Sequence, residues 1–72
     1  MAGTLGHRIR KARKDAGYSS PEQFSVKLGI SSATLQRYET GRTVPTVSRL
    51  LQIALLTRQP VGFFLNGDQE AA

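Results

Sequence analysis

Basic side chains gather near the start of this 72-residue chain, which has ten Lys or Arg, five Asp or Glu and a formal net charge of +5. Residues 1–17 contain one acidic residue, Asp15, and five basic residues, Arg8, Arg10, Lys11, Arg13 and Lys14. Such a positive field suits a polyanion, because Lys and Arg neutralise phosphates and release their counterions. A membrane surface, or a solvated helix face that keeps a small protein in solution, fits the same charge. Charge alone leaves all three interpretations open.

The other reactive side chains do not form a catalytic or metal-binding set. The chain has one histidine, His7, five scattered acids and no cysteine. No serine has a partnered base, and a lone histidine in a basic helix is expected to be solvated. We therefore expect no enzyme activity, no cofactor, no metal and no small-molecule substrate.

Apolar spacing predicts helices and no sheet. Leu5, Ile9, Ala12 and Ala16 recur at intervals of four, three and four, which places them on one stripe of a helix that Gly17 ends. No alternating pattern is long enough to indicate strands.

The second expected helix, residues 21–28, has a recognisable start and end. Ser20 is its N-cap, Pro21 takes the first helical position, Gln23 completes a capping box, and Gly29 ends it. Its inward side chains are Phe24, Ser25 and Leu28.

The third helix is expected to run from its cap Ser31 through Thr40, with Leu35 and Tyr38 inward and Gly41 as its stop. A fourth helix opens at residues 45–46 and forms the main core element. Its apolar residues are Val47, Leu50, Leu51, Ile53, Ala54, Leu55 and Leu56.

A brief fifth element is expected from Pro60 through Leu65. Residues 1–67 then form one domain, and residues 68–72 a disordered polar tail.

Residues 21–40 predict a helix-turn-helix. Two short helices that cross steeply need a small side chain at the crossing, glycine in the turn and flanking apolar residues. Ser25, Gly29, Leu28 and Leu35 meet these demands. The arrangement is typical of DNA-binding domains.

Three stretches resemble the Cro/C1-type (XRE, lambda-repressor-like) family. They read LGHRIRKARKDAGY, FSVKLGISSATLQRYETGRTVP and SRLLQIA, and the resemblance covers residues 5–65. It implies an all-α, compact five-helix lambda-repressor-like domain whose helix-turn-helix is formed by helices 2 and 3.

The resemblance also implies that the third helix lies in the major groove and reads base edges. The base-reading positions are Ser32, Ala33, Gln36 and Arg37. Helical periodicity agrees, because it puts these residues opposite Leu35 and Tyr38. Arg can grip guanine and Gln adenine with paired hydrogen bonds, and Ala33 offers a methyl contact to thymine.

Phosphate contacts are expected around the ends of the two helices, where backbone N–H groups and basic side chains collect. The candidates are Ser20, Pro21, Glu22, Ser31, Ser32, Thr40, Arg42 and Thr43. Arg42 would equally suit an electrostatic cap of the third helix. Family members also pair an arginine of the first helix with a glutamate of the third. Arg13 and Glu39 occupy those positions, with Arg13 expected to face a phosphate as well as the glutamate.

These features predict a sequence-specific, double-stranded DNA-binding transcriptional regulator, a repressor acting as a homodimer in the cytoplasm of a bacterial cell or phage-infected host. Leu55 and Phe63 are the candidates for dimer contacts, while Phe64 and Leu65 are expected to close the core. The alternative is a protein-interaction module, such as an antitoxin or accessory regulator, with the same fold. RNA or membrane-surface binding ranks last, because exposed aromatics and a lipid-facing helix are not expected.

Overall fold

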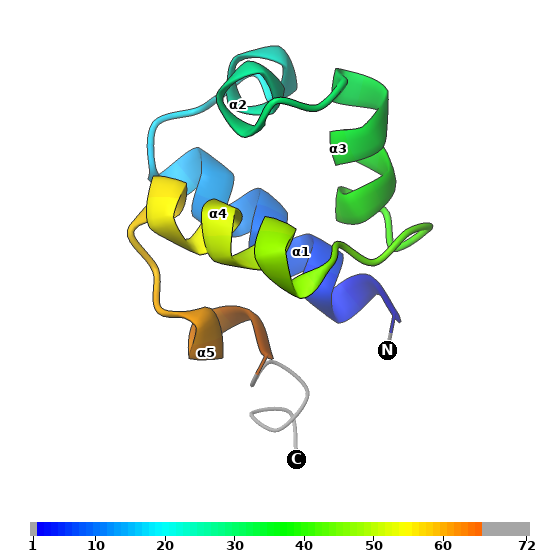
Figure 1. Cartoon of the computed structure of the whole chain (residues 1–72), viewed down its shortest axis with the longest axis vertical. Helices are drawn as coiled ribbons and strands as arrows, with labels where there is room; N and C mark the ends of the chain where they lie inside the picture. The colour runs from blue at the N-terminus through cyan, green and yellow to red at the C-terminus, as the bar shows by residue number, and fades with distance from the viewer. Residues whose placement is uncertain (1, 66–72) are drawn as a thin grey trace.

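The computed structural model describes the backbone of residues 2–65 and the side chains of residues 5–65. This part of the chain folds into five helices without a strand (Figure 1). They are α1 (Ala2–Asp15), α2 (Pro21–Leu28), α3 (Ser32–Glu39), α4 (Val47–Thr57) and α5 (Val61–Leu65). The expected tail at 68–72 and the domain end at residue 67 lie outside the described residues.

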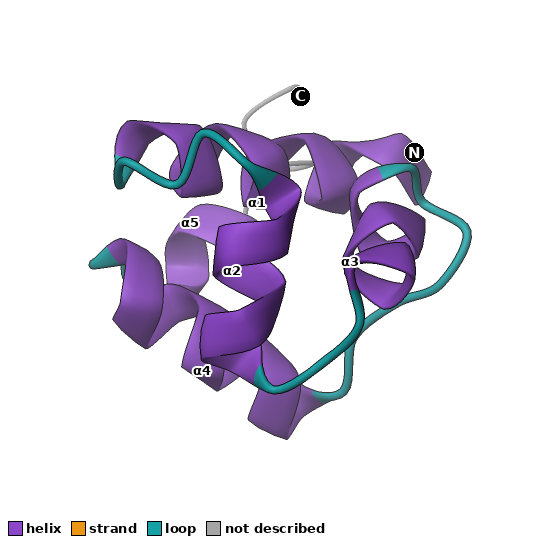
Figure 2. Ribbon diagram, turned by 90° about the horizontal axis from the view of Figure 1, so that it is seen from above, coloured by secondary structure: helices purple, strands orange, loops and turns teal. Residues whose placement is uncertain are grey.

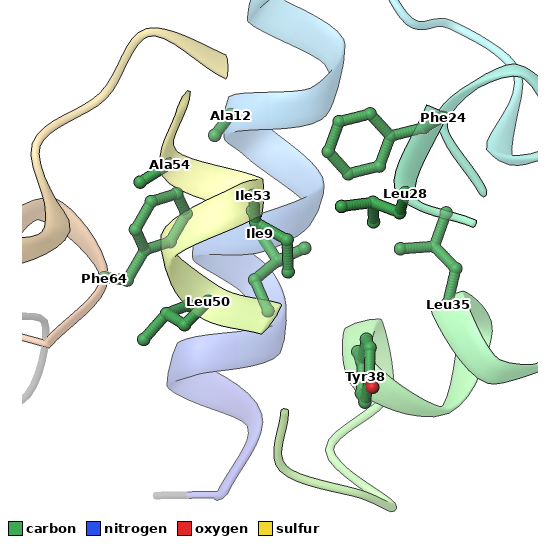
Figure 3. Close-up of a cluster of buried hydrophobic side chains, with 10 residues drawn as sticks. All are labelled: Ile9, Ala12, Phe24, Leu28, Leu35, Tyr38, Leu50, Ile53, Ala54 and Phe64. Carbon is green, nitrogen blue, oxygen red and sulfur yellow. The ribbon is translucent and has the colours of Figure 1, made fainter. Parts of the chain in front are cut away.

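The hydrophobic core draws on all five helices, and α1 contacts α3, α4 and α5 (Figure 3). Its buried members are Ile9, Ala12, Phe24, Leu28, Leu35, Tyr38, Leu50, Ile53, Ala54 and Phe64. Each large apolar side chain removed from water contributes about 1.5–3 kcal/mol toward folding. The core therefore fixes the orientation of α3 against α1.

Helix α1 ends at Asp15, one residue before the last member of its expected apolar stripe. Ile9 and Ala12 are buried, but Ala16 is exposed because α1 ends at Asp15 and Gly17 adopts a φ of 96°. The prediction that Ala16 belongs to the helical stripe was wrong.

Side-chain caps start three helices where hydroxyl residues predicted them. Ser20, Ser31 and Thr46 each accept a hydrogen bond from the backbone N–H three residues onward. The full capping box at Ser20 was wrong. Among the described residues no bond returns from the Gln23 side chain, and the Ser20 hydroxyl lies 3.0 Å from the Glu22 carboxylate instead.

The apolar run of α4 faces two directions. Leu50, Ile53 and Ala54 are buried, whereas Val47, Leu51 and Leu55 are exposed. In α5, Phe64 closes the core as expected. Leu65 does not, since it is 59% exposed. None of the described helices is long and apolar enough to cross a membrane.

Candidate nucleic-acid interface

Helices α2 and α3 cross steeply around a tight turn. In Figure 1 α2 is seen along its axis while α3 lies in the plane, and in Figure 2 the situation is reversed. Gly29 turns the chain with a φ of 75°, and the Ile30 N–H donates to the Ser25 carbonyl at 3.0 Å. The buried Ser25 hydroxyl donates to the Glu22 carbonyl at 2.8 Å, so a small polar side chain at the crossing is satisfied.

The two sides of α3 have opposite exposures. Leu35 is fully buried and Tyr38 is 9% exposed, whereas Gln36 and Arg37 lie at the surface. Ala33 is also exposed. Among the described residues, no hydrogen bond or ion pair engages the side chain of Gln36 or Arg37. These polar groups are therefore open to an outside partner.

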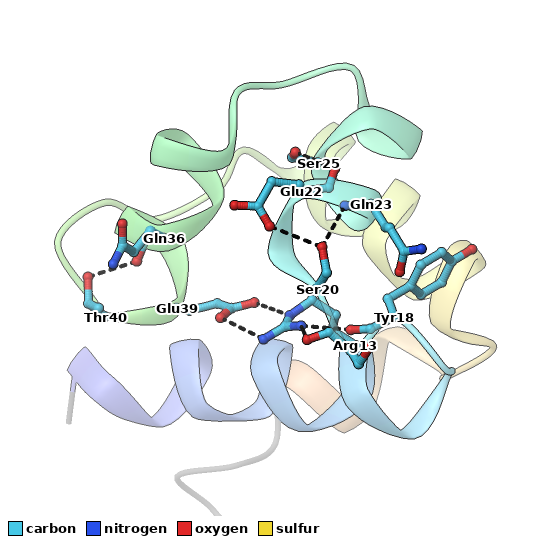
Figure 4. A network of polar contacts seen from close by, with 10 residues as sticks. Arg13, Tyr18, Ser20, Glu22, Gln23, Ser25, Gln36, Glu39 and Thr40 are labelled. Carbon is cyan, nitrogen blue, oxygen red and sulfur yellow. Dashed lines mark hydrogen bonds and ion pairs between the residues drawn. The ribbon is translucent and has the colours of Figure 1, made fainter.

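An ion pair joins the inner side of α3 to α1 (Figure 4). Arg13 Nε donates to Glu39 Oε2 at 2.8 Å, and their side chains are 3% and 9% exposed. Arg13 Nη1 also donates to the carbonyls of Tyr18 and Ser19, at 2.7 and 3.0 Å. Arg13 thus holds α1, α3 and the loop before α2 together.

The burial of Arg13 favours the structural role expected of it over the expected phosphate contact, which stays a prediction. Its guanidinium is buried and already bonded to one carboxylate and two carbonyls. Arg10, three residues earlier on α1, is exposed and lines a hollow between α1, α2 and α3. The three-residue spacing could have indicated that Arg10 lies on the same side of α1 as Arg13, because residues three apart are neighbours on a helix surface.

Gly6 allows α1 and the end of α3 to approach closely, and sequence reasoning missed it. A Cβ at this position would lie 2.5 Å from the Glu39 carbonyl oxygen and 2.6 Å from that of Tyr38. Both obstacles are backbone atoms, which cannot rotate away. A glycine inside an amphipathic helix is the signal that could have drawn attention to it.

The structural role of Arg49 was not predicted from the sequence either. Its Nη1 donates to the Leu28 carbonyl at the end of α2, at 2.7 Å, and to Gln52 Oε1 at 2.8 Å. This bond fastens the end of α2 to α4 across 21 residues of sequence. It supports the turn that leads into α3.

Two hollows flank the exposed side of α3. The first, of about 330 Å³, lies between α1, α2 and α3 and is lined by Arg10, Arg13, Pro21, Glu22, Ser32, Gln36, Glu39 and Thr40. The second, of about 350 Å³, is lined by Ala33, Gln36, Arg37, Thr40 and Arg42. Three exposed arginines, Arg10, Arg37 and Arg42, therefore border a recessed surface centred on α3.

Several residues expected at phosphates already have structural partners. Ser31 Oγ lies 2.9 Å from Thr34 Oγ1, and the Thr40 hydroxyl donates to the Gln36 carbonyl at 2.9 Å. Pro21 has no N–H, and a carboxylate such as Glu22 repels an anion. Among the expected phosphate-binding residues, Arg42 and Thr43 have exposed side chains that suit a phosphate. Backbone N–H groups at the starts of α2 and α3 suit one as well.

Comparison with known proteins identifies the family. A family model described as helix-turn-helix matches residues 9–64. The chain belongs to the Cro/C1-type helix-turn-helix family. This is a family of DNA-binding transcriptional regulators, and the all-helical fold with its α2–turn–α3 unit agrees with it.

Relatives with regulator names match most of this helix-turn-helix chain. An uncharacterized transcriptional regulator in the ATPase CF(0) region of Rhodospirillum rubrum is 32% identical over 86% of the chain and 56% of its own length. An uncharacterized HTH-type regulator of Sinorhizobium medicae is 38% identical over 83% and 42%. The HTH-type transcriptional regulator ImmR of Bacillus subtilis is 32% identical over 92% and 51%. The chain spans about half the length of these relatives, and no solved structure matches it.

Proposed function

We propose that this domain binds double-stranded DNA sequence-specifically, with α3 in the major groove, and that it represses transcription by occupying a promoter. The observation that carries the proposal is that the Gln36 and Arg37 side chains are exposed, without a partner among the described residues, on a helix held by the buried Leu35 and Tyr38. A rigid helix with free hydrogen-bonding side chains can meet base edges without first breaking internal bonds.

Base reading is divided among the exposed residues of α3. Arg37 donates paired bonds to guanine O6 and N7, and Gln36 pairs with adenine N6 and N7. Ser32, half-buried at the start of α3, offers a hydroxyl, and Ala33 a methyl group. Each good bidentate pair discriminates against a wrong base by about 1–3 kcal/mol.

Phosphate contacts set the orientation of α3 on the duplex. Arg42 and Thr43, just after α3, approach one backbone, and Arg10 of α1 reaches the other side of the recessed surface. The first backbone N–H groups of α2 and α3 point to phosphates between them. These contacts give affinity that is independent of sequence and falls with salt.

Selection from a random duplex pool tests the proposal. We expect enrichment of a near-palindromic site whose preferred guanine is lost in Arg37→Ala, while the variant keeps the fold of the parent chain. A pool in which no sequence is enriched by the parent chain contradicts sequence-specific binding.

The working form on DNA is a homodimer, since two recognition helices about 34 Å apart multiply specificity. Leu55 is the better of the two dimer candidates, because it is 79% exposed beside a hollow of about 670 Å³ lined by Leu51, Pro60 and Val61 among others. Phe63 is less suited, because it is half-buried, its ring lies 5.1 Å from the Arg8 guanidinium carbon, and its carbonyl accepts a bond from Arg8.

Sedimentation tests the dimer. Leu55→Glu is expected to hold the protein monomeric on a two-half-site duplex, whereas Val26→Glu, at an equally exposed valine of α2, leaves assembly unchanged. Identical assembly of both variants would contradict a role for Leu55.

The exposed side of α4 favours a second candidate, a protein-interaction module such as an antitoxin or accessory regulator. Val47, Leu51 and Leu55 recur every four residues and are 76%, 47% and 79% exposed. Binding to a random duplex distinguishes the two, because a DNA-binding surface loses affinity steeply with salt and an apolar protein contact does not. Salt-insensitive or absent duplex binding would favour the module.

A further inference from the structure

Ala33 and Arg37 share one face of α3 and one hollow. They are four residues apart, so their Cβ atoms are neighbours on the helix surface, about 5–6 Å apart. Both are exposed, and both line the hollow of about 350 Å³ with Gln36, Thr40 and Arg42. No other described group bonds to the Arg37 side chain. The hollow therefore combines an apolar methyl group with a free, flat guanidinium.

The chemistry of guanine recognition places a second base against this guanidinium. Paired bonds to O6 and N7 hold the guanidinium in the plane of the guanine. The preceding base on the same strand lies about 3.4 Å along the axis. The right-handed twist of the duplex brings the C5 position of a preceding pyrimidine toward the N7 side of the guanine, over the guanidinium face. A methyl group on that carbon makes an apolar contact that hydrogen cannot make.

The small side chain at position 33 leaves room for that methyl group. Ala33 ends at Cβ, so the space between it and Arg37 is bounded by an apolar atom instead of being filled by a longer side chain. A Gln or Arg at position 33 would occupy this space and bond to a base edge itself. Alanine suits a methyl group, which it contacts without burying a polar atom.

We propose that each half-site contains a TpG step, in which Arg37 binds the guanine and the 5-methyl of the thymine directly 5′ of it sits between Ala33 and the guanidinium. The inference rests on the proposed function and adds to it the chemical feature that is read. Since the methyl group and not the pyrimidine edge is recognised, 5-methylcytosine at the same position makes the same contact. Methylated CpG then binds better than unmethylated CpG.

Four duplexes test this with the full chain. Each carries the selected site with thymine, uracil, cytosine or 5-methylcytosine before the guanine whose preference depends on Arg37. Burial of one methyl group changes affinity about fourfold. We expect thymine to exceed uracil, and 5-methylcytosine to exceed cytosine, by this same factor in each half-site.

Matched variants assign the methyl effect to Arg37. Arg37→Lys keeps the charge but removes the flat guanidinium, and it is expected to reduce both methyl ratios to below twofold. Arg58→Lys makes the same chemical change after α4, outside the two hollows beside α3, and it is expected to keep both ratios.

Three results would each overturn the inference while leaving sequence-specific binding intact. They are equal binding of the thymine and uracil duplexes, enriched sites without TpG, and methyl ratios that are unchanged in Arg37→Lys. Failure to enrich any sequence would instead remove the proposed function and this inference with it.

Discussion

The inner and outer sides of α3 are built from adjacent residues, but the inner side contacts α1 and the outer side faces solvent. On the inner side, Glu39 pairs with the buried Arg13, and the helix end rests against Gly6 of α1. On the outer side, the side chains of Gln36 and Arg37 have no hydrogen-bond or ion-pair partner among the described residues. One helix can therefore stabilise the fold with one side and present a binding surface with the other. Substitutions on the two sides should therefore have separable effects.

Arg13→Ala, on the inner side of α3, should destabilise the domain more than any other substitution considered. It leaves the Glu39 carboxylate and two carbonyls without their donor in a buried site, and breaking a buried ion pair costs about 3–5 kcal/mol. Because a chain of this size has a small margin of stability, the variant is expected to be largely unfolded at 25 °C. Circular dichroism during urea unfolding measures this.

Lys11→Ala is the matched control for Arg13→Ala. Lys11 forms the other described ion pair of α1, with Asp15 at 3.1 Å, but both side chains are more than half exposed. Its loss is expected to cost less than about 0.5 kcal/mol. Equal destabilisation by the two variants would show that the Arg13 pair is no more important than a surface pair.

On the outer side, Arg37→Ala is expected to change binding and not folding. The side chain is exposed and unpartnered, so the free energy of unfolding should move by less than about 0.5 kcal/mol. Affinity for the selected site should fall by about 1–3 kcal/mol, while affinity for a random duplex falls much less. Fluorescence anisotropy with both duplexes checks this. A variant that unfolds would break the division between the two sides of α3.

A smaller effect on the inner side is expected from Gly6→Ala. The new Cβ would lie 2.5 Å from a backbone carbonyl oxygen of α3, and overpacking of this kind costs about 1–3 kcal/mol. The higher helix propensity of alanine returns up to about 1 kcal/mol, so a net loss of up to about 2 kcal/mol is expected. His7→Ala, at the exposed neighbouring position, should leave stability nearly unchanged. A Gly6→Ala protein as stable as the parent would contradict the close approach of α1 and α3.

Features encoded by neighbouring residues could be predicted from the sequence. Ser31 as a cap and the spacing of Leu35 and Tyr38 place α3 and decide which of its sides is exposed. Contacts between distant segments could not be predicted this way. Two such contacts form only once the helices have packed: the Arg49 bond to the Leu28 carbonyl and the close approach of α3 to Gly6.

The candidate site shows the same limit. Its exposed residues on α3 follow from helical periodicity, but the depth at which Arg13 is buried does not. A basic residue on a basic helix resembles a phosphate ligand until its partners are seen. Arg10, three residues earlier on α1, is exposed and lines the hollow between α1, α2 and α3.

The smallest expected effect compares the ends of α3 and α4. Gly41 follows α3 with a φ of 81°, whereas Arg58 follows α4 with a φ of 59°, the one described residue other than glycine in the left-handed region. This conformation costs a residue with a Cβ about 1–2 kcal/mol, and glycine gives back part of the gain through the greater entropy of its unfolded chain. Arg58→Gly is therefore expected to stabilise the domain by about 0.5–1 kcal/mol, measured by urea unfolding. Arg58→Ala keeps the Cβ and should not gain stability. If glycine and alanine prove equally stable there, the strain lies elsewhere, and the contrast between the two helix ends has no energetic consequence.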